Sequence, residues 1–335
     1  MTGLMIALFL MPLQGPELTP IWATRLQTEI QSYVIGETAI FFGTNDSYGA
    51  LDQATGKKIW AKSVAQPQLG VFVAEGDGTI YASIGQGNLI AANAATGKPL
   101  WTLKRTGYAS PIGFANQSLY AEVEEGKLSA INASGKALWS AKLGGSLSTR
   151  PIRYNRAIFA GLKTGAIHAF DKDSGKPIWK YAERKSSVQA LLVSGERLIV
   201  TYDDGTIHGL SLATGQRMWG VYTNNALFGV PLLHEGRLFA VSASGRFYCI
   251  ASENGQELWV RSLSFQQNFG LSQVMPYRDG FLLADKAKLV ALDSEGLKMW
   301  EMDTGSEMTG NQPRPLGDDL LLTGSHEFRR VRLKY

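Results

Sequence analysis

The stretch ALDQATGKKIW, residues 50–60, decides how this chain folds, because close copies of it recur along the sequence. AANAATGKPLW follows at 91–101 and AFDKDSGKPIW at 169–179. All eight tryptophans belong to this series, at intervals of 38 to 41 residues: Trp22, Trp60, Trp101, Trp139, Trp179, Trp219, Trp259 and Trp300. From Trp60 onward each follows a glycine by four residues: Gly56, Gly97, Gly135, Gly175, Gly215, Gly255 and Gly296. Such a period indicates a repeat architecture.

Each part of the unit has a structural role. A strand-like alternation ends in a small side chain that can hydrogen-bond its own backbone: Asp52, Asn93, Asn132, Asp171, Ser211, Ser252 or Asp293. The glycine supplies the positive φ of a tight hairpin, and a short strand then carries the buried Trp. Two more strands fit upstream, as in ALLVSGERLIVTYDDGTIHGLSLATGQRMW, residues 190–219, with turns at SGER, DDG and LATG. Four antiparallel strands per unit predict the blade of a β-propeller.

The two ends of the chain set the number of blades. LTPIWATRL, residues 18–26, is a Trp strand without a unit before it, whereas the segment after Trp300 has strands but no Trp strand. We therefore expect the N-terminal strand to pair near Leu320 to Arg332 and leave no open edge. The prediction is an all-β, single-domain, eight-bladed propeller over residues 16–335, its ring closed by the N-terminal strand.

The apolar run at residues 4–13, LMIALFLMPL, is too short to span a bilayer. It is typical of the core of a secretory signal peptide, so residues 1–15 are expected to be removed and the mature protein to begin near Pro16. The alternatives are a buried first strand or a start codon assigned too late. We expect an exported protein, periplasmic or extracytoplasmic, without an integral membrane segment. No Cys follows the run, so no lipid anchor is expected.

The unit A-[LFI]-[DN]-x-x-[TS]-G-K-x-x-W resembles the repeat of the pyrroloquinoline-quinone-type (quinoprotein-like) β-propellers, and the resemblance covers essentially the whole mature chain. WD40 repeats share the period but end in Trp-Asp, a dipeptide that these units lack. The family has two branches: quinone-dependent alcohol and sugar dehydrogenases, and non-catalytic propellers of the BamB type, which act in outer-membrane assembly.

The resemblance implies what a dehydrogenase would need: a Trp and a disulfide of adjacent cysteines around the quinone, Ca²⁺ ligands, and an Asp as base. Here Cys249 is alone within FYCIAS and is interpreted as a small core residue. We therefore predict no catalytic residue, cofactor site or metal site, and assign the chain to the non-catalytic branch.

Other reactive side chains favour structural interpretations. His168 and His208 occupy the same phase of neighbouring units, although adjacent blades could bring them together; His234 and His326 lie in turn-like contexts, and none has metal-ligand spacing. The pairs Asp203–Asp204 and Asp318–Asp319 are expected to shape hairpins.

The charge does not point to nucleic acid as a partner. The formal net charge of +4 is small and spread along the chain. In RRVRLKY, residues 329–335, Val331, Leu333 and Tyr335 alternate with Arg330, Arg332 and Lys334, so the basic side chains are expected to face the solvent.

Two inter-blade segments are candidates for binding a protein partner, because aromatic and amide side chains suit such contacts. Residues 261–273 and 220–229 supply Phe265, Gln266, Gln267, Asn268, Phe269, Tyr222, Asn224 and Asn225. The alternative is that Phe265 and Phe269 fill the gap between blades. In BamB-type proteins the resemblance implies a partner surface with a Leu–Arg pair and an Asp-x-Asp element. The corresponding stretches, 105–111 and 145–151, do not carry the Asp-x-Asp element.

The function expected from the sequence is a non-catalytic protein-interaction scaffold of the cell envelope, monomeric, with a partner that the sequence does not name. The alternatives are a quinone-dependent dehydrogenase or its accessory subunit, and a carbohydrate-binding propeller.

Overall fold

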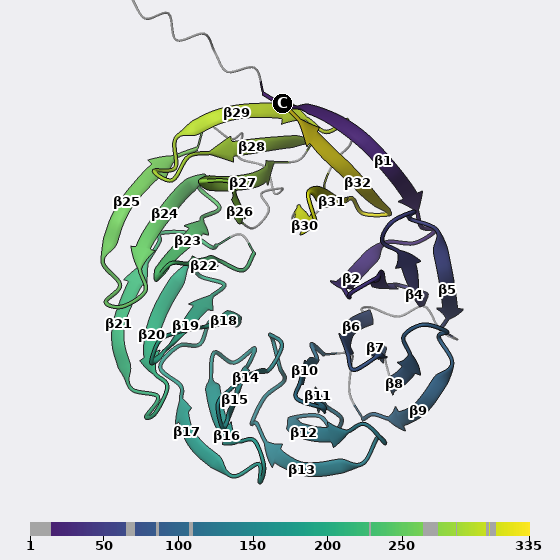
Figure 1. The fold of residues 1–335 in the computed structure, drawn as a ribbon. Helices are drawn as coiled ribbons and strands as arrows, with labels where there is room; N and C mark the ends of the chain where they lie inside the picture. Colours follow the sequence, from purple (N-terminus) through teal and green to yellow (C-terminus); the bar gives the residue numbers. More distant parts are fainter. Residues whose placement is uncertain are drawn as a thin grey trace, which may run out of the picture.

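Eight four-stranded antiparallel sheets form a ring in the computed structural model (Figure 1). The structure describes residues 15–64, 71–84, 87–106, 110–227, 229–263, 274–285, 287–305, 308 and 313–335. Within these residues the sheets are the blades of an eight-bladed β-propeller, as the repeat predicts.

Each blade runs from the centre of the ring to its rim (Figure 1). The innermost strands are β2 (Ile30–Ile35), β6 (Val71–Gly76), β10 (Gly113–Ala115), β14 (Ile152–Tyr154), β18 (Val188–Ser194), β22 (Leu232–His234), β26 (Met275–Tyr277) and β30 (Arg314–Leu316). The second strands are β3 (Ala39–Thr44), β7 (Thr79–Ile84), β11 (Ser118–Glu122), β15 (Ala157–Gly161), β19 (Arg197–Tyr202), β23 (Arg237–Val241), β27 (Gly280–Asp285) and β31 (Asp319–Thr323).

The third and fourth strands complete the blades. The third strands are β4 (Ser47–Asp52), β8 (Asn88–Asn93), β12 (Lys127–Asn132), β16 (Ile167–Asp171), β20 (Thr206–Ser211), β24 (Arg246–Ala251), β28 (Lys288–Leu292) and β32 (Glu327–Lys334). The outermost are β5 (Lys58–Ser63), β9 (Pro99–Lys104), β13 (Ala137–Lys142), β17 (Pro177–Tyr181), β21 (Arg217–Tyr222), β25 (Glu257–Ser262), β29 (Lys298–Asp303) and, from the N-terminal side of the chain, β1 (Glu17–Arg25).

The ring closes as the sequence predicts. Strand β1 pairs antiparallel with β32, in the order β1-β32-β31-β30, with Glu17 opposite Lys334 and Arg25 opposite Glu327. The outer strand of the last blade therefore comes from the start of the described chain, and the ring has no missing strand at the junction.

The glycine of the repeated unit has a positive φ in each of the seven units. Asp52 Oδ1 accepts a hydrogen bond from the Thr55 backbone N–H at 2.8 Å, and Gly56 has a φ of +68°. The predicted turn is thus confirmed in this blade. Ser252 was expected to play the same part, and this is wrong: its hydroxyl donates to the Gly236 carbonyl at 2.7 Å, while Asn254 Oδ1 accepts from the Gln256 N–H.

A β-bulge marks the place where each Trp meets the third strand. Trp60 pairs with Ala50, and the register shifts between Ala50 and Leu51; the same shift recurs in six other blades. The residue opposite the Trp is small in each of these seven blades, because the indole lies over it: Ala50, Ala91, Ala130, Ala169, Gly209, Cys249 and Ala291. A bulge increases the local twist, which suits a propeller blade.

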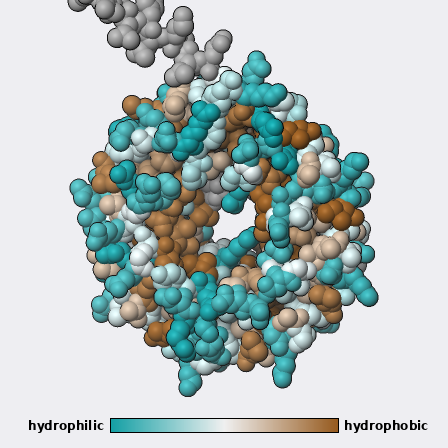
Figure 2. Space-filling model, viewed as in Figure 1, coloured by the Kyte–Doolittle hydropathy of each residue, from teal (hydrophilic) through white to brown (hydrophobic). Residues whose placement is uncertain are grey.

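The hydrophobic core lies mainly between neighbouring blades. One cluster combines Ala50 and Trp60 of one blade with Val73 and Ile80 of the next. Another joins Ile40 and Phe42 to Phe328 across the ring closure. The described blades surround a central opening, which is visible in the space-filling view (Figure 2). Blades that bury apolar surface against both neighbours form a stable ring, and their loops are left to face the two ends.

Candidate interaction surface

The repeated Trp and Gly residues lie at the contacts between blades. A Cβ built on each of seven glycines would come within 2.5–2.9 Å of an indole from the preceding blade, so the ring rests directly on the glycine backbone. The pairs are Trp22 with Gly56, Trp60 with Gly97, Trp101 with Gly135, Trp139 with Gly175, Trp179 with Gly215, Trp219 with Gly255, and Trp259 with Gly296. Trp300 belongs to the cluster that joins its blade to the last one.

Indole hydrogen bonds tie many of these contacts. Five tryptophans donate Nε1–H to a backbone carbonyl of the following blade: Trp22 to Gln53, Trp60 to Ala94, Trp101 to Ala133, Trp139 to Lys172, and Trp179 to Leu212. Trp219 differs, since its Nε1 is buried without an acceptor among the described residues. These positions therefore join blades to one another.

An ion cluster around the buried Asp319 in the last blade corrects two expectations. Asp319 is only 2% exposed and does not merely shape a turn: its carboxylate lies 2.6 Å from Arg330 Nη2 and 2.6 Å from Arg332 Nε. Arg330, expected to face the solvent, also donates from Nη1 to the Gln53 carbonyl of the next blade at 3.0 Å. Arginine forms such contacts because its guanidinium carries several donors in one plane.

The remaining reactive residues are part of the packing. Cys249 is fully buried, as expected, and burial raises the pKa of its thiol to about 11. His168 and His208 lie opposite Lys180 and Gly220 in their respective blades. Burial, followed by the neighbouring cationic side chains, lowers the pKa of each imidazole to about 4, so both rings are neutral near pH 7.

Only some of the candidate binding residues lie within the described part of the chain. Phe265, Gln266, Gln267, Asn268 and Phe269 lie outside the described residues. Of the other three, Tyr222 is the last residue of β21, and Asn224 and Asn225 come just after it. Tyr222 ends that strand with 58% of its surface exposed, Asn224 has a φ of +59°, and Asn225 Oδ1 accepts the Ala226 N–H at 2.9 Å. The Asn225 side chain is therefore used in the turn, whereas the Tyr222 ring is free to contact a ligand.

Parts of the stretches 105–111 and 145–151, which the sequence analysis compared with the BamB-type partner surface, line one hollow. It has a volume of about 410 Å³. Its lining comes from residues that precede β10, β14 and β18, from two turns between second and third strands, from the end of β11 and from β6: Ser110, Pro111, Ser146, Leu147, Ser148, Ser187, Glu125, Lys163, Glu122 and Phe72. Four serines and charges of both signs share its lining with apolar surface from Phe72, Pro111 and Leu147.

Two buried charged residues hold this hollow in shape. Arg105, 4% exposed, donates from Nε to the Glu122 carbonyl at 2.7 Å and from Nη2 to Ser110 Oγ at 2.9 Å. The Glu122 carboxylate accepts the Gly126 N–H at 2.7 Å and the Leu147 N–H at 3.1 Å. Burial lowers the pKa of Arg105 to about 10, so it remains a cation. Hydrogen bonds thus link the loops of adjacent blades. They could not be predicted from the sequence because the partners lie far apart in the chain.

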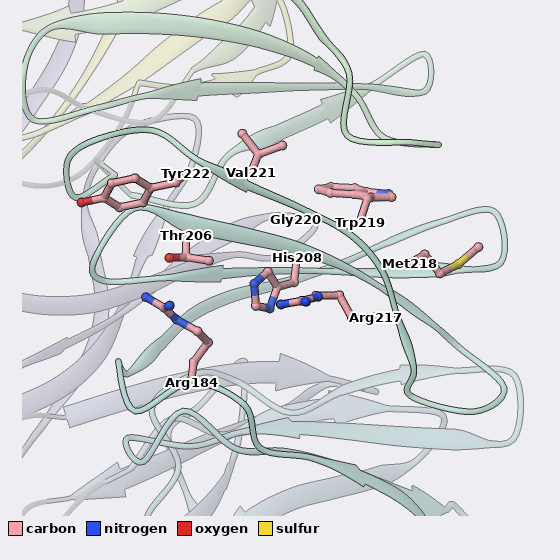
Figure 3. A pocket seen from close by; sticks show the side chains of 9 residues that line it. All are labelled: Arg184, Thr206, His208, Arg217, Met218, Trp219, Gly220, Val221 and Tyr222. Carbon is pink, nitrogen blue, oxygen red and sulfur yellow. The ribbon is translucent and has the colours of Figure 1, made fainter.

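A second hollow, of about 630 Å³, lies along the outer strand β21. Figure 3 shows its lining residues: Arg184, Thr206, His208, Arg217, Met218, Trp219, Gly220, Val221 and Tyr222. Only Tyr222 among these was selected from the sequence as a candidate for ligand contact.

The sequence model of one protein family, described as outer membrane protein assembly factor BamB, matches residues 44–157, 124–267 and 203–329. The chain belongs to this family. The matches together span residues 44–329 and so cover most of the ring.

Individual BamB proteins are distant relatives. BamB of Shewanella oneidensis is 24% identical over 83% of this chain and 67% of its own length; BamB of Nitrosomonas eutropha is 19% identical over 62% and 55%. The chain spans about half the length of several of the curated relatives it matches. Tetrathionate hydrolase of Acidithiobacillus ferrooxidans is 22% identical over 69% of this chain and 46% of the enzyme.

Solved structures share the BamB-type fold. BamB from Moraxella catarrhalis superimposes with a TM-score of 0.75 at 17% identity, covering 95% of this chain and 98% of that one. Quinohemoprotein alcohol dehydrogenase from Comamonas testosteroni gives 0.73 at 12%, covering 94% and 76%. At these identities the likeness concerns the fold alone.

Two features are absent from the described residues. No group of three or more His, Cys, Asp or Glu side chains there is placed to hold a metal ion. No helix in that part of the chain has the length and apolar character needed to cross a membrane.

Proposed function

We propose that this chain is a non-catalytic protein-interaction scaffold of the cell envelope. We further propose that it binds a protein partner at the hollow of about 410 Å³, which is lined by the loops that lead into β10, β14 and β18. Membership of the BamB family over residues 44–329 supports this function. The observation that carries the choice of surface is that loops leading into three consecutive blades line one hollow.

The chemistry of that hollow suits a segment of a folded partner that carries both polar and apolar side chains. Serine hydroxyls donate and accept hydrogen bonds, while Glu125 and Lys163 offer charges of both signs at its edge. Phe72 and Leu147 add apolar surface. Because Arg105 and Glu122 already fix the backbone of these loops, a partner would meet a preorganised surface and lose less entropy on binding.

A pull-down from the native envelope fraction tests the surface. We expect the double charge reversal Glu125→Lys/Lys163→Glu, at exposed positions, to reduce partner recovery at least about tenfold. The control is Lys136→Glu/Glu295→Lys, on exposed hairpins at the opposite end of the third strands, which should recover the partner as the unmodified protein does. If the two double variants recover equal amounts of the partner, the partner does not bind at this hollow.

We also propose that residues 1–15 are a signal peptide and that residues 16–335 are the mature, single-domain propeller. Fractionation followed by N-terminal sequencing should find a chain that begins near Pro16 outside the cytoplasm. A cytosolic pool that retains Met1 would contradict export.

The quinone-dependent alternative is tested separately. A dehydrogenase needs a stacking partner, a cation and a base around the quinone, and the sequence offers no set of residues that supplies all three. Incubation with pyrroloquinoline quinone and Ca²⁺ should therefore give neither stoichiometric binding nor dye-linked oxidation of alcohols or sugars. Measurable turnover would replace the scaffold function with an enzymatic one.

A further inference from the structure

The hollow along β21 includes a position, Gly220, where the residue has no side chain. Gly220 follows Trp219 directly, and the same place in the other blades holds Ala23, Ala61, Thr102, Ser140, Lys180, Val260 or Glu301. In β20 and β21 Gly220 lies opposite His208, and a Cβ at Gly220 would approach His208 Cδ2 and Nε2 to 3.1 and 3.4 Å. The Nε2 edge of the imidazole therefore faces the space that Gly220 leaves open.

We assign the tautomer of His208 from the contacts of the Tyr181 hydroxyl. The Tyr181 hydroxyl lies 2.8 Å from His208 Nδ1 and donates its single proton to the Glu183 carboxylate at 3.0 Å. A hydroxyl that has given its proton away can only accept from the imidazole, so Nδ1 carries the hydrogen of the neutral ring. His208 is 3% exposed, and its Nε2 is consequently a hydrogen-bond acceptor turned toward the hollow.

The charges around this acceptor are balanced. Arg217 pairs with Glu183 at 2.9 Å, and Arg184 pairs with Asp204. Figure 3 shows the His208 ring between the side chains of Arg184 and Arg217. An anionic ligand would have to compete with both carboxylates, whereas an uncharged ligand can use the spare guanidinium donors without disturbing either pair.

The rest of the lining favours a ligand that both donates and accepts. Thr206 and Tyr222 lie opposite each other in the strand register and carry hydroxyl groups, while the exposed Tyr222 ring offers an apolar face. The volume of about 630 Å³ is that of a pocket for a small molecule.

We infer that this hollow is a binding site for an uncharged, polyhydroxylated ligand of sugar size, which donates a hydroxyl proton to His208 Nε2, accepts hydrogen bonds from Arg184 and Arg217, and packs on Tyr222. This site lies on the rim of the ring and is independent of the protein-binding surface proposed above. Hydroxyl groups of this kind occur in free sugars and at the ends of polysaccharides.

Titration calorimetry on the full chain tests the site. The uncharged probes are glucose, N-acetylglucosamine and maltose. The comparison probes are the anions glucuronate and inorganic phosphate and the tripeptide Gly-Ser-Gly. We expect at least one uncharged sugar to bind with a Kd on the order of 1 mM. Gly220→Thr, which introduces the side chain found at Thr102, should weaken binding at least tenfold, and Tyr222→Ala should do so as well. Ala61→Thr makes a similar change at the equivalent place of another blade and should bind as the unmodified protein does.

Co-sedimentation with starch granules and with chitin then separates the two sources of the ligand, because only a polysaccharide-directed site retains the protein on them. The inference is overturned if no uncharged sugar binds, if only glucuronate or phosphate binds, or if the tripeptide binds as well as the sugars. It is equally overturned if Gly220→Thr and Tyr222→Ala bind sugar like the unmodified protein.

Discussion

Trp22 and Arg330 lie opposite each other in the pairing of β1 with β32, and both donate a hydrogen bond of 3.0 Å to the carbonyl oxygen of Gln53. One side chain comes from the first strand of the described chain and the other from the last. The acceptor belongs to the first complete blade. This pair therefore joins the two ends of the ring to a third segment.

Removal of the closing strand should open the ring. Deletion of residues 16–26 removes β1 and leaves the backbone of β32 as an unpaired edge, so we expect a sharply lower Tm and concentration-dependent association. Differential scanning calorimetry and light scattering measure the two effects. A deletion of equal length in an inter-blade loop should do less; a truncated protein that melts like the intact one and stays monomeric would show that β1 does not close the propeller.

Asp319→Asn should destabilise the last blade by about 3 kcal/mol, because Arg330 and Arg332 lose their shared counter-ion. Burial raises the pKa of Asp319, but hydrogen bonds and charge from the two arginines lower it further, and the net pKa lies below its usual value. This stabilisation is therefore present above about pH 4 and is lost as pH falls through the lowered pKa.

Urea denaturation at pH 7 measures the change in the free energy of unfolding. Asp318→Asn, at the exposed neighbouring position, is the matched control and should change it by less than about 0.5 kcal/mol. Equal effects of the two variants would mean that the ion cluster does not stabilise the fold.

Trp179→Ala should cost about 3–5 kcal/mol, since the indole packs on Gly215 of the next blade and donates to the Leu212 carbonyl at 2.9 Å. Ile178→Ala changes the preceding residue, which is 48% exposed, and should have little effect on the midpoint of chemical denaturation. Similar midpoints for the two variants would argue against the Trp as a contact that joins blades.

The two buried histidines should make stability depend on pH. Their pKa values of about 4 in the folded protein lie below 6.5, the value of the unfolded chain, so the unfolded chain binds more protons between these limits. The free energy of unfolding therefore falls as pH drops from 6.5 toward 4, by at most about 3 kcal/mol per histidine.

Denaturation series at pH 7 and pH 4.5 should show a smaller difference for His168→Gln/His208→Gln than for the unmodified protein. His234→Gln, at the end of β22, is the control with an exposed imidazole and should retain the full difference. An unchanged difference in the double variant would exclude these two rings as its source.

Much of the architecture was predictable because it depends on local sequence. Asp52 and Gly56 form their turn through contacts only a few residues apart, and the glycine four residues before the Trp recurs with a positive φ in all seven units from Trp60 onward. Even the ring closure could be derived, since the Trp strand at Trp22 lacks a unit and the last unit lacks a Trp strand.

The side-chain chemistry was decided by tertiary structure. Asp319 and Arg330 looked like a turn residue and a solvent-facing residue, and only the register of β31 with β32 and the approach of Gln53 made them a buried cluster. His208 and His168 share one phase of the repeat, yet the neighbour across the strand is glycine in one blade and lysine in the other. Sequence alone determined the repeating backbone, because turns and strand alternation are local. The contacts that shape the hollows and bury the charges join residues from different strands and blades, so only the folded ring established them.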